Sequence, residues 1–323
     1  MNMLARHRTP IRGGLALLLT VPLLGACATG DVEAGGVAVN ATAPAQVAGD
    51  EHDGMSAMPS PATEAGAGAG DGYTAVGLPS THVHGVALNP ADGRVYLASH
   101  DGLFRYDAGG PVRVGPVIDL MGFTVAGPDR FYASGHPGPG VDLPQPVGLI
   151  ESVDGGDTWA VRSRGGESDF HTLAATGDGV LGFDGALRQS TDDQTWEILD
   201  PPVDPYAVAV SPDGTQILIT SRSGPRRSTD GGQTWEAIDT APLLQVVDWA
   251  DEQTVVGVTP TGSVAVSEDA GATWSTRAET ESAPQAVGAH TTADGRLGVL
   301  VVTADTVLES SDAAQTFAPL APS

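Results

Sequence analysis

Short apolar runs recur along the chain, and Gly, Asp, Pro or Ser separates each run from the next. Six of them occupy equivalent places in successive segments: 84–88, 121–125, 171–175, 206–210, 245–249 and 285–289. A turn such as 212–214 follows a run, and a β-branched run such as 216–220 follows the turn. Apolar runs of this length between turn residues predict β-strands joined by tight turns.

A motif with the pattern Ser-Xaa-Asp-Xaa-Gly-Xaa-Thr-Trp repeats at a nearly constant interval. Full copies start at Ser152, Ser228 and Ser267, and altered copies start at Ser190 and Ser310. The starts lie 38, 38, 39 and 43 residues apart. A period of that size in a strand-rich chain is typical of a β-propeller. We therefore predict an all-β fold, a six-bladed β-propeller of four strands per blade, with seven blades as the alternative count.

Two details of this arrangement can be predicted. The first blade lacks the motif and has residues 102–107 as its third strand, while residues 73–78 could add an edge strand that helps to close the ring. In each motif the Ser and Asp side chains can bond to the backbone of a tight turn, and Gly accommodates a positive φ. We call these segments the Asp-box turns, and we assign a structural role to their aspartates: Asp154, Asp192, Asp230, Asp269 and Asp312.

On these motifs, over residues 83–317, the chain resembles the Asp-box (BNR) repeat β-propeller lipoproteins of the sialidase and glycosyl hydrolase-like superfamily. The resemblance implies the propeller fold. In sialidases it also implies an arginine triad, a Tyr–Glu pair and an acidic proton donor. This sequence has no Arg-Ile-Pro motif, and Arg222, Arg226 and Arg227 fall in one blade instead of three. The catalytic residues of sialidases therefore have no counterparts here, and the resemblance transfers a fold without an activity.

The first 27 residues have the features of a bacterial lipoprotein signal peptide. Arg6, Arg8 and Arg12 precede a short apolar run that ends in Leu-Gly-Ala-Cys27. The run is too short for a comfortable membrane span, and Cys27, the only cysteine, is the predicted lipidation site. Residues 28–72 are rich in Ala, Gly and Pro, which predicts a disordered tether, and residues 73–323 would form the propeller. We expect an extracytoplasmic protein anchored to the cell membrane.

The amino-acid composition limits the possible binding partners. The formal net charge is −25, and all 15 basic residues are arginines. So acidic a surface repels nucleic acid and anionic lipid head groups, which excludes a nucleic-acid-binding role. We expect a monomer, with the membrane contacted through the lipid on Cys27.

Five of the eight histidines fall in the first three predicted blades. His82, His84 and His171 lie at the start of first strands, and His100 and His136 lie in connections from second to third strands. In a propeller these places share one face, so the five imidazoles should converge near the central axis, beside Met121. Imidazole suits copper or zinc and thioether favours copper, so the arrangement predicts a metal site. The alternative is a polar funnel that binds a sugar.

Acidic residues near the same opening give a second hypothesis. Glu167 and Asp169 are the candidate catalytic pair for cleaving a glycoside, a reaction that needs two carboxyl groups, and Asp101 and Asp184 lie close by. A Gly/Pro-rich insertion, 137–146, is expected to form a stiff flap over the opening. The competing functions are therefore ligand or metal binding, hydrolysis of extracellular glycans, and assembly or scaffolding of a membrane protein complex.

Overall fold

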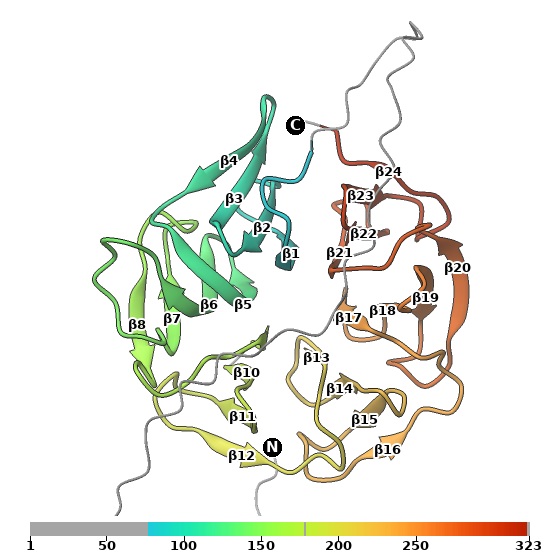
Figure 1. The fold of residues 1–323 in the computed structure, drawn as a ribbon. Helices are drawn as coiled ribbons and strands as arrows, with labels where there is room; N and C mark the ends of the chain where they lie inside the picture. Colours follow the sequence, from blue (N-terminus) through green and yellow to red (C-terminus); the bar gives the residue numbers. More distant parts are fainter. Residues whose placement is uncertain (1–76, 178, 322–323) are drawn as a thin grey trace, which may run out of the picture. The chain divides into compact units, whose positions relative to one another are not determined.

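The structure is a computed structural model that describes residues 77–177 and 179–321 (Figure 1). These residues form six four-stranded antiparallel sheets arranged in a ring, and none of them is helical. The prediction of a six-bladed β-propeller is confirmed, and the alternative of seven blades is wrong. The predicted signal peptide, Cys27 and the predicted tether lie outside the described residues. No helix in the described part is long and apolar enough to cross a membrane.

Each blade uses four strands that are consecutive in sequence. Blade 1 contains β1 (Val83–Leu88), β2 (Val95–Ser99), β3 (Gly102–Asp107) and β4 (Gly110–Val114). Blade 2 contains β5 (Ile118–Gly127), β6 (Arg130–Pro137), β7 (Leu149–Ser152) and β8 (Ala160–Ser163). Blade 3 contains β9 (Thr172–Ala175), β10 (Val180–Phe183), β11 (Leu187–Ser190) and β12 (Glu197–Leu199).

The second half of the ring repeats this arrangement. Blade 4 contains β13 (Ala207–Val210), β14 (Ile217–Thr220), β15 (Arg226–Ser228) and β16 (Glu236–Ala237). Blade 5 contains β17 (Val246–Trp249), β18 (Val255–Val258), β19 (Ser263–Ser267) and β20 (Ser275–Glu279). Blade 6 contains β21 (Ala286–Thr291), β22 (Leu297–Val302), β23 (Val307–Ser310) and β24 (Ala318–Pro319). The six predicted first strands all become innermost strands. The predicted extra strand at 73–78 lies mostly outside the described residues, and Gly77 and Leu78 are not in a strand.

The hydrophobic core lies between neighbouring blades. Tyr96 of blade 1 packs edge-on against Phe131 of blade 2, with ring centroids 5.0 Å apart, and Phe123 packs on the same ring at 5.5 Å. Between blades 5 and 6 the contact is made by β-branched residues instead, including Val256 and Val301, both fully buried. Each innermost strand contacts the next around the ring, and β1 contacts β21.

Side chains of blade 6 close the ring against blade 1. The Val83 amide donates a hydrogen bond to Gln285 Oε1 at 2.7 Å, and Gln285 Nε2 donates to the Thr81 carbonyl at 3.2 Å. Because each blade is continuous in sequence, this closure needs no strand exchanged between the two ends of the propeller.

The Asp-box turns join third to fourth strands. In blade 2, Asp154 Oδ1 accepts from the Thr158 amide at 2.9 Å and from Ser152 Oγ at 2.8 Å, and Oδ2 accepts from Thr158 Oγ1 at 2.6 Å. Gly156 has a φ of 95°, and a Cβ there would lie 2.3 Å from Leu103 Cδ2 in blade 1. Glycine therefore allows the turn to pack tightly on the preceding blade.

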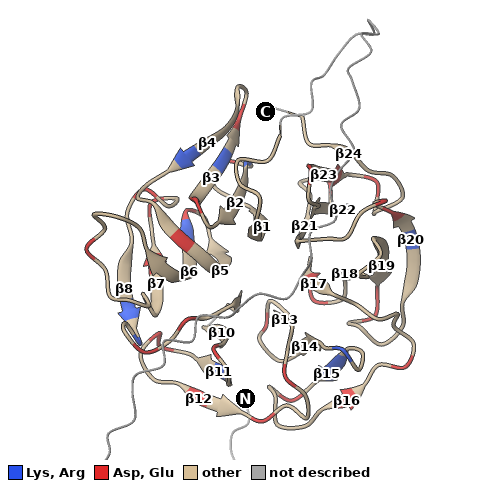
Figure 2. Cartoon of the chain, viewed as in Figure 1, with Lys and Arg blue, Asp and Glu red and all other residues tan. Residues whose placement is uncertain are grey.

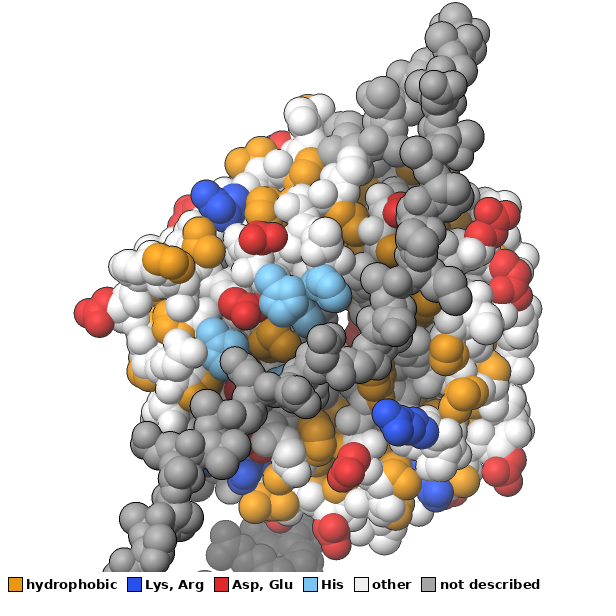
Figure 3. Space-filling model, in the orientation of Figure 1, with side chains coloured by type: hydrophobic (Ala, Val, Ile, Leu, Met, Phe, Trp, Pro, Cys, Tyr) orange, Lys and Arg blue, Asp and Glu red, His pale blue; other side chains and the backbone are white. Residues whose placement is uncertain are grey.

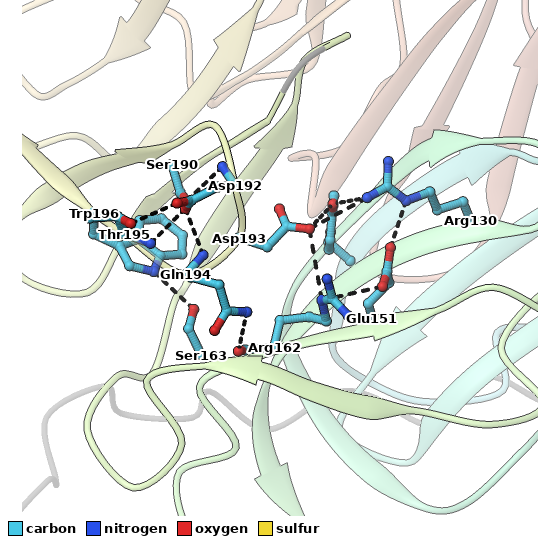
Figure 4. Close-up of polar contacts among 11 residues, drawn as sticks. Arg130, Glu151, Arg162, Ser163, Ser190, Asp192, Asp193, Gln194, Thr195 and Trp196 are labelled. Carbon is cyan, nitrogen blue, oxygen red and sulfur yellow. Dashed lines mark hydrogen bonds and ion pairs between the residues drawn. The ribbon is translucent and has the colours of Figure 1, made fainter.

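The altered copy in blade 3 replaces this close approach with a polar network (Figure 4). Asp193, buried at a φ of 61°, accepts a hydrogen bond of 2.7 Å from Tyr132 Oη of blade 2. Arg130 and Arg162 lie on either side, and both pair with Glu151, at 2.6 and 3.4 Å. This copy of the motif is one residue shorter than the others, and its Asp193 lies against blade 2. There the positive charges of Arg130 and Arg162 neutralise the negative charges of Glu151 and Asp193.

Candidate functional site

The entrance of the channel on the face opposite the Asp-box turns is lined by the residues that begin the first strands. We call this entrance the mouth. The equivalent rim positions, one from each blade in order, are His84, Met121, His171, Tyr206, Gln245 and Gln285, of which His84 and Gln285 line the channel itself. Figure 3 shows histidines gathered on this face over blades 1 to 3, beside acidic side chains. The rim therefore has a histidine-rich half, from blades 1 to 3, and an uncharged half, from blades 4 to 6.

A pair of imidazoles from two strand ends forms the centre of the histidine-rich half. His84 lies in β1, and His100 lies in the turn between β2 and β3. Their Nε2 atoms are 3.2 Å apart, and the rings meet edge to face. His100 Nδ1 is 2.6 Å from Oδ1 of Asp119, which lies in β5 of the next blade. A carboxylate on Nδ1 favours the tautomer with the proton there, so the lone pair of His100 Nε2 faces His84.

His82 extends this pair toward solvent. Its ring centroid is 5.4 Å from that of His100, and its side chain is exposed. Met121, predicted as a soft ligand, lies half-buried in β5 at a β-bulge between Leu120 and Gly122. The contacts among the mouth histidines, Asp119 and Asp169 do not include the Met121 side chain.

A carboxylate held by two histidines lies on the blade 3 side of the mouth. Asp169 Oδ2 is 2.9 Å from His171 Nε2 and 3.1 Å from His136 Nε2. Gln145 Nε2 approaches His136 Nδ1 at 3.5 Å, which leaves that nitrogen as the acceptor. The other Asp169 oxygen, Oδ1, is buried and has no hydrogen-bond partner among the described residues.

The two groups differ in how their surroundings shift the pKa values. Burial, followed by the neighbouring His100, lowers the pKa of His84 to about 4, so His84 is neutral at pH 7. The hydrogen bond from His171 to Asp169 raises the pKa of His171. Burial alone would raise the pKa of Asp169, but the bond from His171 and the nearby His136 lower it overall. Blade 1 therefore supplies a neutral imidazole, His84, whereas on the blade 3 side His171 and Asp169 stabilise each other's charged forms.

The fit to a metal ion is partial. Two nitrogens bound to one tetrahedral ion at about 2.0–2.1 Å lie about 3.3 Å apart, and His84 and His100 match this separation. Within residues 77–177 and 179–321, however, no three His, Cys, Asp or Glu side chains are already arranged to hold an ion. A metal would find two ligands in place and would need His82 or another group to rotate.

The candidate hydrolytic acids are placed differently. The Glu167 side chain is 67% exposed and lies 3.6 Å from Arg164, whereas Asp169 is held by the two histidines. Asp184 is 5% exposed and is paired with Arg188 at 2.9 Å, and Asp101 is exposed in a turn. The insertion 137–146 is fixed to blade 2 through a hydrogen bond from the Gly138 amide to the Val117 carbonyl at 3.0 Å.

Two acidic residues of the innermost strands were missed by the sequence reasoning. Asp119 orients His100, and Asp248 of β17 lines the central channel below the mouth, a cavity of about 630 Å³. The available signal was the same in both cases: a carboxylate within an otherwise apolar run. Without the blade register, nothing distinguished these two from the many acids on the surface.

Comparisons with known proteins support the fold class. A gluconolactonase from Xanthomonas campestris superposes with a TM-score of 0.55 at 12% identity, covering 69% of this chain and 84% of that one. A chain of a nidogen–laminin complex gives 0.54 at 14% identity, covering 69% and 91%. A GH74 xyloglucanase from Xanthomonas campestris gives 0.49 at 15% identity and covers 74% of this chain, which spans 38% of the enzyme.

No protein-family model and no curated protein matches the sequence. The two likenesses with TM-scores above 0.5 show the β-propeller fold alone, because their identities are low. The functional argument therefore depends on the mouth and the channel.

Proposed function

We propose that the mouth binds a transition-metal ion, copper or zinc, with His84 and His100 as the first two ligands. The separation of 3.2 Å between their Nε2 atoms is the observation that carries the proposal. To bind one ion with both atoms, His84 must hold its proton on Nδ1. The lowered pKa of His84 supports this role, because a neutral imidazole is the metal-binding form.

The surroundings of the pair support an open site rather than a closed structural one. Asp119 would fix His100 as the outer carboxylate does in a carboxylate–histidine–metal arrangement. The exposed His82 could supply a third nitrogen after a side-chain rotation, and a ligand from solvent would complete the coordination. His136, His171 and Met121 are the further candidate ligands. The first two must give up a contact with Asp169, or offer Nδ1, to take part.

The test is metal content and coordination in the full-length protein. After loading with copper or zinc and removal of excess metal, the parent should retain one equivalent. Cu(II) in it should show nitrogen hyperfine splitting in electron paramagnetic resonance. His84→Ala and His100→Ala should each lose the metal, while His290→Gln, a change in blade 6, should retain it. Equal retention in the parent and in both alanine variants would contradict the proposal.

We also propose that this site lies outside the cytoplasmic membrane, anchored through a lipid on Cys27. The support is the signal-like sequence of residues 1–27 and the tether-like composition of residues 28–72. Metabolic labelling with a radioactive fatty acid should mark the parent protein, and Cys27→Ser should abolish the label and release the protein from membranes. A labelled Cys27→Ser protein would contradict this assignment.

A further inference from the structure

The channel below the mouth contains one carboxyl group among side chains that are otherwise mostly apolar. Its lining consists mostly of Ala and Val, with Thr and Gly, from the six innermost strands and the turns that follow them. Among the lining residues Asp248 is the only acid, and the other ionisable side chains are His84 at the mouth and His290 near the far end. The cavity of about 630 Å³ is within the usual range for a small-molecule site.

The blade repeat shows that the backbone contact of Asp248 needs no charge. Asp248 Oδ2 accepts a hydrogen bond of 2.8 Å from the Ala289 amide of the next blade. Thr124, at the same position of blade 2, accepts the equivalent bond from the Ala175 amide at 3.2 Å with a hydroxyl. The other four blades have small residues at this position: Ala87, Ala174, Ala209 and Gly288. A carboxyl group is thus larger and more polar than the fold requires here.

Asp248 also lacks a counter-charge among the described residues. The nearby basic groups pair with acids outside the channel instead. His100 pairs with Asp119, His136 and His171 pair with Asp169, and Arg188 pairs with Asp184. None of the six innermost strands carries an arginine, and Figure 2 shows no blue on β1, β17 or β21. His290 does not take this role, because its ring lies against Gly298 of β22. Burial therefore raises the pKa of Asp248 to about 7.

We propose that the channel binds a small organic cation, whose ammonium group pairs with Asp248 and whose apolar part packs on the Ala and Val wall. Such a ligand would supply the missing counter-charge, and its hydrocarbon would match the lining. A metal ion fits this place less well, because metals take several oxygen or nitrogen ligands and the lining offers one carboxylate. Asp248 is not part of the histidine pair, although His84 also lines the channel.

The experiment is calorimetric titration of the full-length protein with n-butylammonium, and with n-butanol as the uncharged analogue. At pH 8, butylammonium should bind at least tenfold more tightly than butanol. Asp248→Thr keeps an amide acceptor, as Thr124 does in blade 2, and should lose at least tenfold in affinity for the amine. Asp239→Asn removes one charge from an exposed position outside the channel and controls for the overall acidity; it should bind like the parent.

A measurement at pH 5 keeps the test valid even if Asp248→Thr does not fold. The amine stays protonated at pH 5, but Asp248 becomes neutral, so the affinity of the parent should fall at least tenfold. His84, with a pKa of about 4, stays mostly neutral at pH 5, and burial lowers the pKa of His290, so most of the fall should come from Asp248 and should be smaller in Asp248→Thr. Equal binding of amine and alcohol, equal binding by the parent and Asp248→Thr, or no amine binding at all would overturn the proposal.

Discussion

The Asp-box turns and the mouth both contain aspartates that make hydrogen bonds. They differ in whether polar atoms of the network remain available to a ligand. In an Asp-box turn every bond of the carboxylate comes from its own turn, as in Asp269, which binds the Thr273 amide, Thr273 Oγ1 and Ser267 Oγ. At the mouth Asp119 binds His100 of another blade and Asp169 binds His136 of another strand as well as the nearby His171, and each imidazole has a second nitrogen. The turns are closed networks, and the mouth is an open one.

The aspartates of the Asp-box turns also differ in pKa from Asp248 in the channel. Hydrogen bonds from Thr side chains and amides lower the pKa of Asp230, Asp269 and Asp312 to about 2. Burial without a counter-charge raises that of Asp248 to about 7. The same residue type is thus stabilised as an anion on one face and destabilised as an anion inside the channel. Satisfied carboxylates serve the fold, whereas an unsatisfied one costs stability and indicates a binding role.

The largest expected effect concerns Asp248. Its folded pKa lies above the unfolded value of about 4, so the folded state holds the proton more tightly and stability falls as the pH rises from 4 to 7. The loss is at most about 4 kcal/mol. Asp248→Asn should remove it and be more stable than the parent at pH 8 but not at pH 4, as measured by urea unfolding at both values. Parallel curves for the two proteins would show that Asp248 is not a buried anion.

Breaking a closed network should cost somewhat less. Asp269→Ala removes three hydrogen bonds and takes the acceptor from three donors of the turn, so we expect a loss of about 2 kcal/mol in the free energy of unfolding. For a propeller of this size that lowers the melting temperature by about 4–8 °C. Glu268→Gln, next to it, breaks only an exposed pair with Arg277 and should change the melting temperature little. Similar losses in both variants would contradict the structural role.

Changing an open network should affect binding more than stability. Asp119→Asn keeps the shape but weakens the orientation of His100, and such outer carboxylates typically contribute 10- to 100-fold in metal affinity. We therefore expect copper or zinc affinity, measured by competition with a chromogenic chelator, to fall by about that factor. The melting temperature without metal should change by less than in Asp269→Ala. Unchanged affinity would show that Asp119 does not act through His100.

A smaller effect should appear at the blade 3 side of the mouth. The pKa of His171 is raised through Asp169, so the protonated pair is fully formed below about pH 6.5 and is lost as the pH rises through the higher folded value. In Asp169→Asn the His171 pKa, followed by NMR titration, should return toward its ordinary value. A raised pKa that persists in Asp169→Asn would mean that another group holds the proton.

The smallest effect is expected at Glu167, whose side chain is exposed and lies 3.6 Å from Arg164. Glu167→Gln should leave metal content and melting temperature unchanged. It also tests the competing prediction of a glycoside hydrolase. If aryl-glycoside substrates are turned over by the parent and not by Glu167→Gln, the acid pair rather than the histidine pair defines the site.

Much of the fold could be predicted because the repeat is local. An apolar run, a turn and a β-branched run are each specified within a few residues, and the Asp-box spacing gave the blade length. The predicted first strand at 245–249 became Val246–Trp249, and the third strand at 102–107 is observed with the same bounds. The prediction that residues at first-strand starts and at second-to-third connections share one face is what placed His84 and His100 at one opening.

The sequence by itself determined the class of fold, the blade boundaries and the face on which the histidines lie, because these follow from short-range pattern and from the geometry of an antiparallel sheet. Only the tertiary structure decided which side chains meet. His84 and His100 lie 3.2 Å apart and Asp169 is shared by two imidazoles because three blades bring their strand ends together. The isolation of Asp248 likewise exists only once six strands surround it, since the cost of a charge depends on everything around it and not on its neighbours in sequence.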